Sequence, residues 1–274
     1  MSTVTPLSTQ ESPPPPKIGI LDSGVGGLSV LREIRSLLPS TPIHYVGDSA
    51  WCPYGTKSPE QIRGRTFEIT DYLIQQGATI VVIACNSATI HAVGSLRESY
   101  LLPIVGMEPA VKPAAAATKS GVVGVLATEA SIAGEKFLRL VDTHAQGIRV
   151  ITRPCPRFVE LVEEGILTGP GAEAAVDEAV QPLLDEGADV FVLGCTHYPF
   201  LRPVIEDRLP AGSTLIDTGP AVAKRTRSLL ALPTDPSETS SEIVIETTGD
   251  LTHLDAILPL LLPGLTATTA HFAP

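Results

Sequence analysis

A ten-residue pattern that occurs twice constrains the fold of this chain more than any other feature. Residues 77–86 read GATIVVIACN, and residues 187–196 read GADVFVLGCT. In both copies a glycine, an alanine and a polar residue precede an apolar run, which ends in a small residue, a cysteine and a short polar residue. Continuously apolar strands are typical of parallel sheets that are covered on both faces. The pattern therefore predicts two similar α/β units, each with a cysteine at a strand end.

Strands and helices alternate along the rest of the chain. Residues 28–38 carry apolar side chains at helical spacing, and Ser58, Pro59 and Gln61 form the sequence signature of a helix start with a capping box. The predicted strands cover residues 17–24, 42–48, 79–84, 121–128, 188–193, 213–217 and 242–250, and the other predicted helices cover 58–77, 172–186 and 251–262. This alternation predicts the α/β class, with two similar parallel-sheet domains that face each other across a cleft holding the active site.

The predicted domains have uneven boundaries. Residues 1–16, MSTVTPLSTQESPPPP, have the composition of a disordered extension. Pro103, Pro109 and Pro113 mark a crossover between the domains. We expect a first domain of residues 17–109 plus 217–274 and a second of residues 110–216, with strands 213–217 and 242–247 as candidates to return to the first.

Composition excludes several classes of function. The net charge of −11 argues against a nucleic-acid partner or an anionic membrane surface, because both require basic patches. No apolar stretch has the length of a spanning helix, and residues 1–16 lack the features of a signal peptide. The four cysteines are then expected to be reduced thiols in a cytoplasm. Neither CxxC nor HExxH occurs, so no metal site is predicted.

The positions of Cys85 and Cys195 indicate a chemical role. A single cysteine at a strand end is commonly a small buried hydrophobe, but both copies lie at the carboxyl ends of strands, where α/β proteins bind ligands. Both precede a predicted helix start, which favours a thiolate, and Asn86 is the expected N-cap of the first helix. Two thiols on opposite sides of one carbon, about 7 Å apart, could remove a proton from one face and deliver one to the other. This arrangement is that of a racemase or epimerase.

Two neighbouring groups could assist the thiols. A free thiol with a pKa near 8.5 needs help to act as a base at neutral pH, and Asp22 and His197 are the obvious helpers, one for each half. The segment DSGVGGLS at residues 22–29 resembles a dinucleotide-binding turn, but it has Ser29 at the last glycine position and an acidic residue at its start. Its glycines are more simply explained by a tight turn and close packing around Asp22 and Ser23.

Several motifs together resemble the glutamate racemase family, the cofactor-independent two-cysteine branch of the aspartate/glutamate racemase superfamily. They are KIGILDSGVGGLSVLREI, GDSAWCPYG, VIACNSAT, GCTHYPFLRP, LIDTG and ETTGD, and they occur in order between about residues 17 and 262. The resemblance implies racemisation of L- and D-glutamate without a cofactor. It also implies a bacterial cytoplasmic enzyme that supplies D-glutamate for peptidoglycan synthesis, and thus for cell wall biogenesis and cell shape. We expect a homodimer.

The resemblance also implies roles for residues at matching positions. Cys85 would deprotonate D-glutamate with the help of Asp22, and Cys195 would deprotonate L-glutamate with the help of His197. Glu163 resembles a further acidic helper, although Glu164 fits the motif equally well. The residues implied to contact the substrate are Asp22, Ser23, Pro53, Tyr54, Gly55, Asn86, Ser87, Thr128, Ser131, Thr196 and His197.

Two other functions are compatible with these motifs. An aspartate racemase would keep the chemistry and change the substrate. A binding protein on the same fold is the alternative from another class, since some members of the family are reported to bind DNA gyrase. The intact set of Cys85, Cys195, Asp22 and His197 favours an active enzyme over such a binding protein. A pyridoxal-phosphate racemase is disfavoured, because no lysine lies at either strand end.

Overall fold

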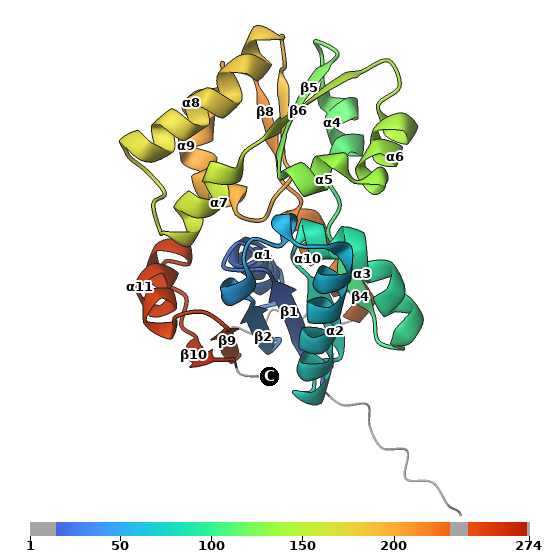
Figure 1. Ribbon diagram of the computed structural model, residues 1–274, viewed down its shortest axis with the longest axis vertical. Coiled ribbons are helices and arrows are strands. Elements are labelled where there is room, and N and C mark those ends of the chain that lie inside the picture. The colour runs from blue at the N-terminus through green and yellow to red at the C-terminus, as the bar shows by residue number, and fades with distance from the viewer. Residues whose placement is uncertain (1–14, 231–240, 273–274) are drawn as a thin grey trace, which may run out of the picture.

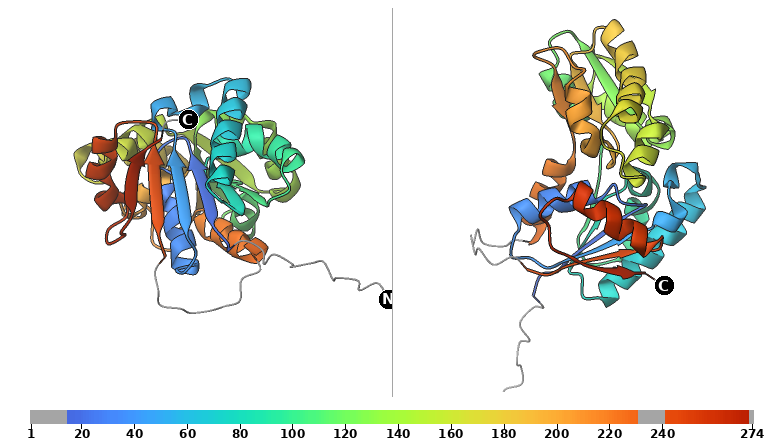
Figure 2. Two further views of the ribbon diagram at one scale, coloured as in Figure 1. Left: turned by 90° about the horizontal axis from the view of Figure 1, so that it is seen from below. Right: turned by 90° about the vertical axis from the view of Figure 1, so that its left-hand side faces the viewer.

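The computed structural model describes residues 15–230 and 241–272, and most of the extension predicted to be disordered, residues 1–14, lies outside them. Two parallel sheets form two lobes, which are visible in Figures 1 and 2. The predicted α/β class with two parallel-sheet units is confirmed. Within the described ranges, no helix is long and apolar enough to cross a membrane.

The first sheet has six strands in the order β10–β9–β2–β1–β3–β4, all parallel. Its strands are β1 (Ile18–Asp22), β2 (Ile43–Gly47), β3 (Ile80–Ile83), β4 (Ile104–Gly106), β9 (Ile243–Thr247) and β10 (Thr268–His271). The predicted return of residues 242–247 to this sheet is confirmed by the pairing of β9 with β2. Strand β10, at the edge, was not predicted.

The second sheet has four parallel strands in the order β6–β5–β7–β8. They are β5 (Val122–Ala127), β6 (Arg149–Pro154), β7 (Val190–Leu193) and β8 (Thr214–Ile216). The idea that residues 213–217 return to the first sheet is wrong, because β8 pairs with β7. This order matches β2–β1–β3–β4 in the first sheet. Strands β3 and β7, which lead to Cys85 and Cys195, therefore occupy equivalent places in the two sheets.

Helices cover both faces of each sheet. The helices of the first lobe are α1 (Leu28–Leu37), α2 (Pro59–Gln75), α3 (Asn86–Ser99), α10 (Gly219–Leu230) and α11 (Leu251–Leu261), with 3-10 turns η1 (Ser49–Trp51) and η2 (Tyr54–Thr56). The helices of the second lobe are α4 (Val111–Ala117), α5 (Glu129–Ala133), α6 (Glu135–His144), α7 (Pro156–Glu163), α8 (Pro170–Asp185) and α9 (Arg202–Glu206), with the 3-10 turn η3 (Tyr198–Leu201).

Burial explains why β1 is apolar at every position but its last. Ile18 and Ile20 belong to the core on the side of α1 and α10, whereas Leu21 belongs to the core on the side of α2 and α3. Each face of the strand is therefore withdrawn from water, as a continuous apolar run requires. The predicted start of α2 is also confirmed, since Ser58 and Gln61 form a capping box. These contacts fix the carboxyl ends of the strands.

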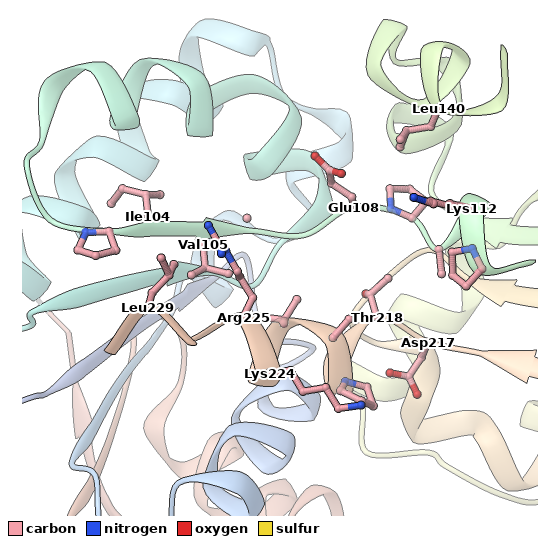
Figure 3. A pocket seen from close by; sticks show the side chains of 18 of the residues that line it. Ile104, Val105, Glu108, Lys112, Leu140, Asp217, Thr218, Lys224, Arg225 and Leu229 are labelled. Carbon is pink, nitrogen blue, oxygen red and sulfur yellow. The ribbon is translucent and has the colours of Figure 1, made fainter. Parts of the chain in front are cut away.

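The chain passes between the lobes twice, from β4 to α4 and from β8 to α10. A large cavity lies at these two crossings. Figure 3 shows Val105 of β4 and Glu108 of the first crossing on one side of this cavity, and Thr218 of the second crossing and Arg225 of α10 on the other. The crossings join the two sheets on the side of β4 and β8. Residues that follow the central strands β1, β3, β5 and β7 line a second, narrower cavity between the lobes.

Candidate active site

Cys85 and Cys195 line the same narrow cavity between the two lobes. Each follows its strand by one intervening residue, and each is almost completely buried. The other residues that line the cavity are Ser23, Pro53, Tyr54, Gly55, Asn86, Ser87, Thr128, Ser131, Val159, Thr196 and His197. All residues predicted to contact the substrate are therefore in the lining except Asp22.

Asp22 lies beneath the cavity at the end of β1 and is fully buried. Its Oδ2 accepts hydrogen bonds from the backbone N–H groups of Gly24, at 3.3 Å, and Gly27, at 2.8 Å, and its Oδ1 has no partner in the part of the chain that the structure describes. Burial raises the pKa of the carboxyl group to about 6, although the charge of His197 and the N–H of Gly27 oppose this shift. Asp22 can thus act on the cavity through its charge.

His197 connects Cys195 to a carboxylate. Its Nδ1 lies 3.6 Å from the Cys195 Sγ, and its Nε2 lies 2.7 Å from the Glu163 Oε1. Burial alone would lower the pKa of His197, but its hydrogen bonds with Cys195, Cys52 and Glu163 raise this pKa well above its usual value. The imidazole is therefore held as a cation that can stabilise a thiolate at Cys195.

The structure distinguishes between the two glutamates at the end of α7. Glu163 points toward His197, and its Oε1 also accepts the backbone N–H of Val25 at 2.9 Å. Burial would raise the pKa of Glu163, but the hydrogen bond to His197 and the charge of that imidazole lower it. Glu164 points outward and lies 3.8 Å from Arg157 with half of its side chain exposed. Glu163 is therefore the carboxylate that can assist His197.

Helix α11 also helps to hold Glu163 in place. The His253 Nε2 lies 2.6 Å from the backbone carbonyl oxygen of Glu163. Figure 1 shows α11, in red, beside the end of α7. Through this contact, a helix of the first lobe supports Glu163 of the second lobe, the residue that pairs with His197.

Cys85 has a different environment. Its Sγ lies 3.6 Å from the Ser23 Oγ. Burial, and then the charge of Asp22, raise the pKa of the Cys85 thiol to about 12, while the Ala88 N–H and the Ser23 hydroxyl lower it only in part. The helix start does favour a thiolate at Cys85 through the Ala88 N–H, but burial and the charge of Asp22 outweigh this effect in the free protein. The cysteine is poised as a thiol until a cation or a proton acceptor enters the cavity.

Two expectations about helix starts are wrong. Asn86 is the first residue of α3 and not its N-cap, because Cys85 occupies the N-cap position. Both polar atoms of the Asn86 side chain are buried without a partner among the described residues, so they are available to a ligand. After Cys195 no α-helix begins directly, because a turn leads into η3 at Tyr198.

The remaining polar groups of the cavity are positioned by local hydrogen bonds. The Thr128 and Ser131 hydroxyls lie 2.8 Å apart at the start of α5, where Thr128 is the N-cap. The Tyr54 hydroxyl donates to Asp48, at 2.6 Å, which fixes the ring at the cavity wall. Val159 is the lining residue that sequence reasoning missed. Its only signal is the apolar face of the segment PRFVELVE, which predicts burial and not a place in a site.

Two thiols that line one cavity between α/β lobes of matching strand order are the arrangement of a racemase that uses two bases. The chain belongs to the Asp/Glu/Hydantoin racemase family, whose sequence model matches residues 18–226. The glutamate racemase of Ectopseudomonas mendocina (strain ymp) is 52% identical over 250 residues, which are 89% of this chain and 94% of that protein. The glutamate racemase of Pseudomonas aeruginosa PAO1 is 51% identical over 215 residues, 78% of this chain and 81% of that protein.

Solved structures of glutamate racemases are also similar to this chain. The crystal structure of Escherichia coli glutamate racemase, in complex with L-glutamate and the activator UDP-MurNAc-ala, matches with a TM-score of 0.84 and 32% identity, covering 95% of this chain and 99% of that chain. The glutamate racemase of Francisella tularensis, in complex with D-glutamate, matches with a TM-score of 0.79 and 28% identity, covering 94% and 97%. The aspartate racemase of Picrophilus torridus has a TM-score of 0.50 and 15% identity, covering 78% and 93%, which shows a shared fold alone.

Proposed function

We infer that this chain interconverts L- and D-glutamate by moving a proton between the two faces of Cα. The observation that carries this inference is that Cys85 and Cys195 line one cavity from opposite lobes. The identity of about one half with glutamate racemases supports glutamate as the substrate. The cell would use the product, D-glutamate, in peptidoglycan synthesis.

In the direction from L- to D-glutamate, the Cys195 thiolate takes the proton from Cα. The imidazolium of His197, which is 3.6 Å from the sulfur and paired with Glu163, stabilises that thiolate before the transfer. The Cys85 thiol then delivers its proton to the opposite face. In the other direction Cys85 is the base. Its proton must leave as D-glutamate binds, because the free thiol has a pKa of about 12.

The groups that hold the substrate come from both lobes. The unpaired amide of Asn86 and the hydroxyls of Ser87, Thr128, Ser131 and Thr196 offer donors for the two carboxylates. We assign the distal carboxylate to Thr196 and its neighbours. Pro53, Tyr54 and Gly55 form the wall of the cavity, and Ser23 supports Cys85. The chain provides its own bases and donors for each step of this proposal.

We propose that the domain boundaries are those predicted from the sequence. Residues 17–109 plus 217–274 would form one domain and residues 110–216 the other, which places the second crossing at a domain boundary. A homodimer in a bacterial cytoplasm is part of this proposal.

Solvent isotope incorporation is the decisive experiment. Purified protein is incubated with L- or D-glutamate in deuterated water, without added pyridoxal phosphate, nucleotide or metal, and circular dichroism follows the conversion. The product should carry deuterium at Cα, because the delivering thiol exchanges with solvent before it donates. Aspartate should be turned over at least about a hundredfold more slowly, because its shorter side chain leaves polar donors unpaired. Equal rates on aspartate would contradict the choice of glutamate.

Replacement of either thiol tests the two-base mechanism separately. Cys85→Ser and Cys195→Ser should each abolish racemisation, since an alkoxide is not accessible at neutral pH. Each tenfold loss in rate corresponds to about 1.4 kcal/mol of barrier. Cys155→Ser is the matched control, because this cysteine is buried behind β6 and donates to the Arg153 carbonyl oxygen. A Cys195→Ser variant with near wild-type rates would rule out the mechanism.

A further inference from the structure

Cys52 has no part in the proposed reaction, and yet its thiol lies against the helper groups of Cys195. It comes directly after η1, one residue before the cavity wall. Its Sγ is 3.5 Å from the Glu163 Oε1, and the His197 Nε2 is 2.7 Å from that same oxygen. The three side chains thus bring one sulfur, one nitrogen and one oxygen to within 4.8 Å of one another.

These distances fit a tetrahedral zinc ion. Zinc binds cysteine sulfur at about 2.3 Å and histidine nitrogen or carboxylate oxygen at about 2.0–2.2 Å. In a tetrahedral site, a sulfur and an oxygen ligand then lie about 3.5 Å apart, which is the separation of Cys52 and Glu163. The His197–Glu163 contact would need to lengthen by about 0.6 Å, which replaces a hydrogen bond by two bonds to the metal. The fourth position is left to water.

The surroundings support such a site. The backbone N–H of Val25 donates to Glu163 at 2.9 Å and orients its carboxylate, as groups behind metal ligands do. A metal on the Nε2 of His197 leaves Nδ1 facing Cys195. Access is open, because the Glu163 side chain is 22% exposed and Cys52 is only partly buried. A thiolate and a carboxylate would together balance the charge of a divalent ion.

We propose that Cys52, Glu163 and His197 form a binding site for one zinc ion, and that zinc bound there reversibly inhibits the enzyme. The ion takes the nitrogen through which His197 pairs with Glu163. Binding releases the Cys52 thiol proton and the His197 Nε2 proton to solvent. His197 is then a neutral ligand and no longer the imidazolium, paired with Glu163, that stabilises a thiolate at Cys195. The inhibition, but not the binding, rests on the proposed racemase function.

Cobalt(II) tests the binding without any assay of activity. A thiolate bound to cobalt gives a charge-transfer band in the near ultraviolet, and tetrahedral cobalt absorbs strongly in the visible. Titration of the full chain should produce both bands in the wild type and in Cys155→Ala, and zinc should displace them. The Cys52→Ala variant should lose the ultraviolet band. Its zinc affinity should fall at least about a hundredfold. Loss of a residue that only supports a metal ligand already lowers metal affinity about 10–100-fold, and loss of a ligand itself should lower it further.

Racemase assays then test the consequence. Zinc should inhibit the wild type in a way that a chelator reverses, and Cys52→Ala should need at least about a hundredfold more zinc for half-inhibition, measured relative to its own metal-free rate. If the ultraviolet band survives in Cys52→Ala and disappears in Cys195→Ala, the catalytic thiol holds the metal and the proposal is wrong. The absence of any band in the wild type would also overturn it. A protein that binds cobalt but lacks racemase activity would contradict the proposed function alone.

Discussion

Asn86 illustrates how a single residue in this protein is arranged for a ligand. It is 5% exposed, and neither its amide nitrogen nor its carbonyl oxygen has a partner within residues 15–230 and 241–272. Leaving a buried polar group unpaired costs about 1–3 kcal/mol. A substrate carboxylate or ammonium group could form hydrogen bonds with this amide. Removal of the cost would then contribute to the free energy of substrate binding.

Asn86→Ala should therefore separate stability from binding. Without substrate, the free energy of unfolding should stay the same or rise, because the unpaired amide is gone. The KM for glutamate should rise at least about tenfold, which is about 1.4 kcal/mol of lost binding. Urea denaturation and steady-state kinetics measure the two effects. An unchanged KM would show that the amide does not contact the substrate.

Asp22 gives the folded protein a pH dependence that the sequence does not show. The carboxyl group has a pKa of about 6 in the folded protein, against 3.8 for an ordinary aspartate, because burial disfavours the charged form. The folded state thus holds this proton more tightly than the unfolded state between about pH 4 and pH 6. Stability must then fall as the pH rises through this window, by up to about 3 kcal/mol.

Asp22→Asn should remove this contribution, because the amide oxygen can accept the same backbone hydrogen bonds and does not ionise. The free energy of unfolding is measured for both proteins between pH 4 and pH 7. The difference, variant minus wild type, should grow from pH 4 to pH 6 and then stay level. Parallel profiles would mean that Asp22 titrates in the folded protein as it does in the unfolded chain.

The turn between β1 and α1, in the first lobe, lies in close contact with residues of the second lobe at two glycines. A Cβ at Gly24 would lie 2.0 Å from the Glu163 Oε1, and a Cβ at Gly26 would lie 2.3 Å from the His197 Nδ1. Any side chain there would collide with the groups that serve Cys195. The prediction that these glycines permit close packing is confirmed, although Gly24 and Gly26 pack against Glu163 and His197, and not around Asp22 and Ser23.

Gly26→Ala should consequently displace His197 and slow racemisation at least tenfold, or about 1.4 kcal/mol of barrier, while the protein stays folded. Gly94→Ala is the matched control, since this glycine lies in α3 with no atom within 4 Å of the added methyl group. There the substitution should leave the rate unchanged and stabilise the helix by about 1 kcal/mol. Thermal unfolding and initial rates distinguish the two variants. Equal rates in both would show that His197 tolerates the methyl group.

Sequence reasoning worked for elements whose residues determine their own structure. The apolar runs before Cys85 and Cys195 are buried on both faces, and the Ser58 capping box is a local hydrogen-bond pattern. It failed where the outcome depends on partners distant in sequence. Nothing within residues 213–217 indicates which sheet they join, and the edge strand β10 has the weakly apolar sequence TTAH. Likewise, the high pKa of Cys85 arises from burial that its neighbours in sequence do not reveal.

At the scale of the whole molecule, the cavity is lined by both lobes, so a bound substrate bridges them. Glutamate at about one hundred times its Kd adds about 2.7 kcal/mol to the stability of the folded state. For a chain of this length, that should raise the Tm by at least about 5 °C. Differential scanning fluorimetry measures the shift, which should be smaller for aspartate at the same concentration. A shift of equal size with both amino acids would argue against selective binding.

In the proposed reaction each enantiomer has its own base, at equivalent strand ends of the two sheets, but the two cysteines have different neighbours: Ser23 and Asp22 for Cys85, His197 and Glu163 for Cys195. Mirror-image substrates have equal free energies in water, so the equilibrium constant of the reaction is one. The Haldane relation then requires equal kcat/KM for the two directions, whatever the neighbours do. The chemical asymmetry between the lobes can change kcat and KM only together, so the direction with the faster turnover must also have the proportionally larger KM.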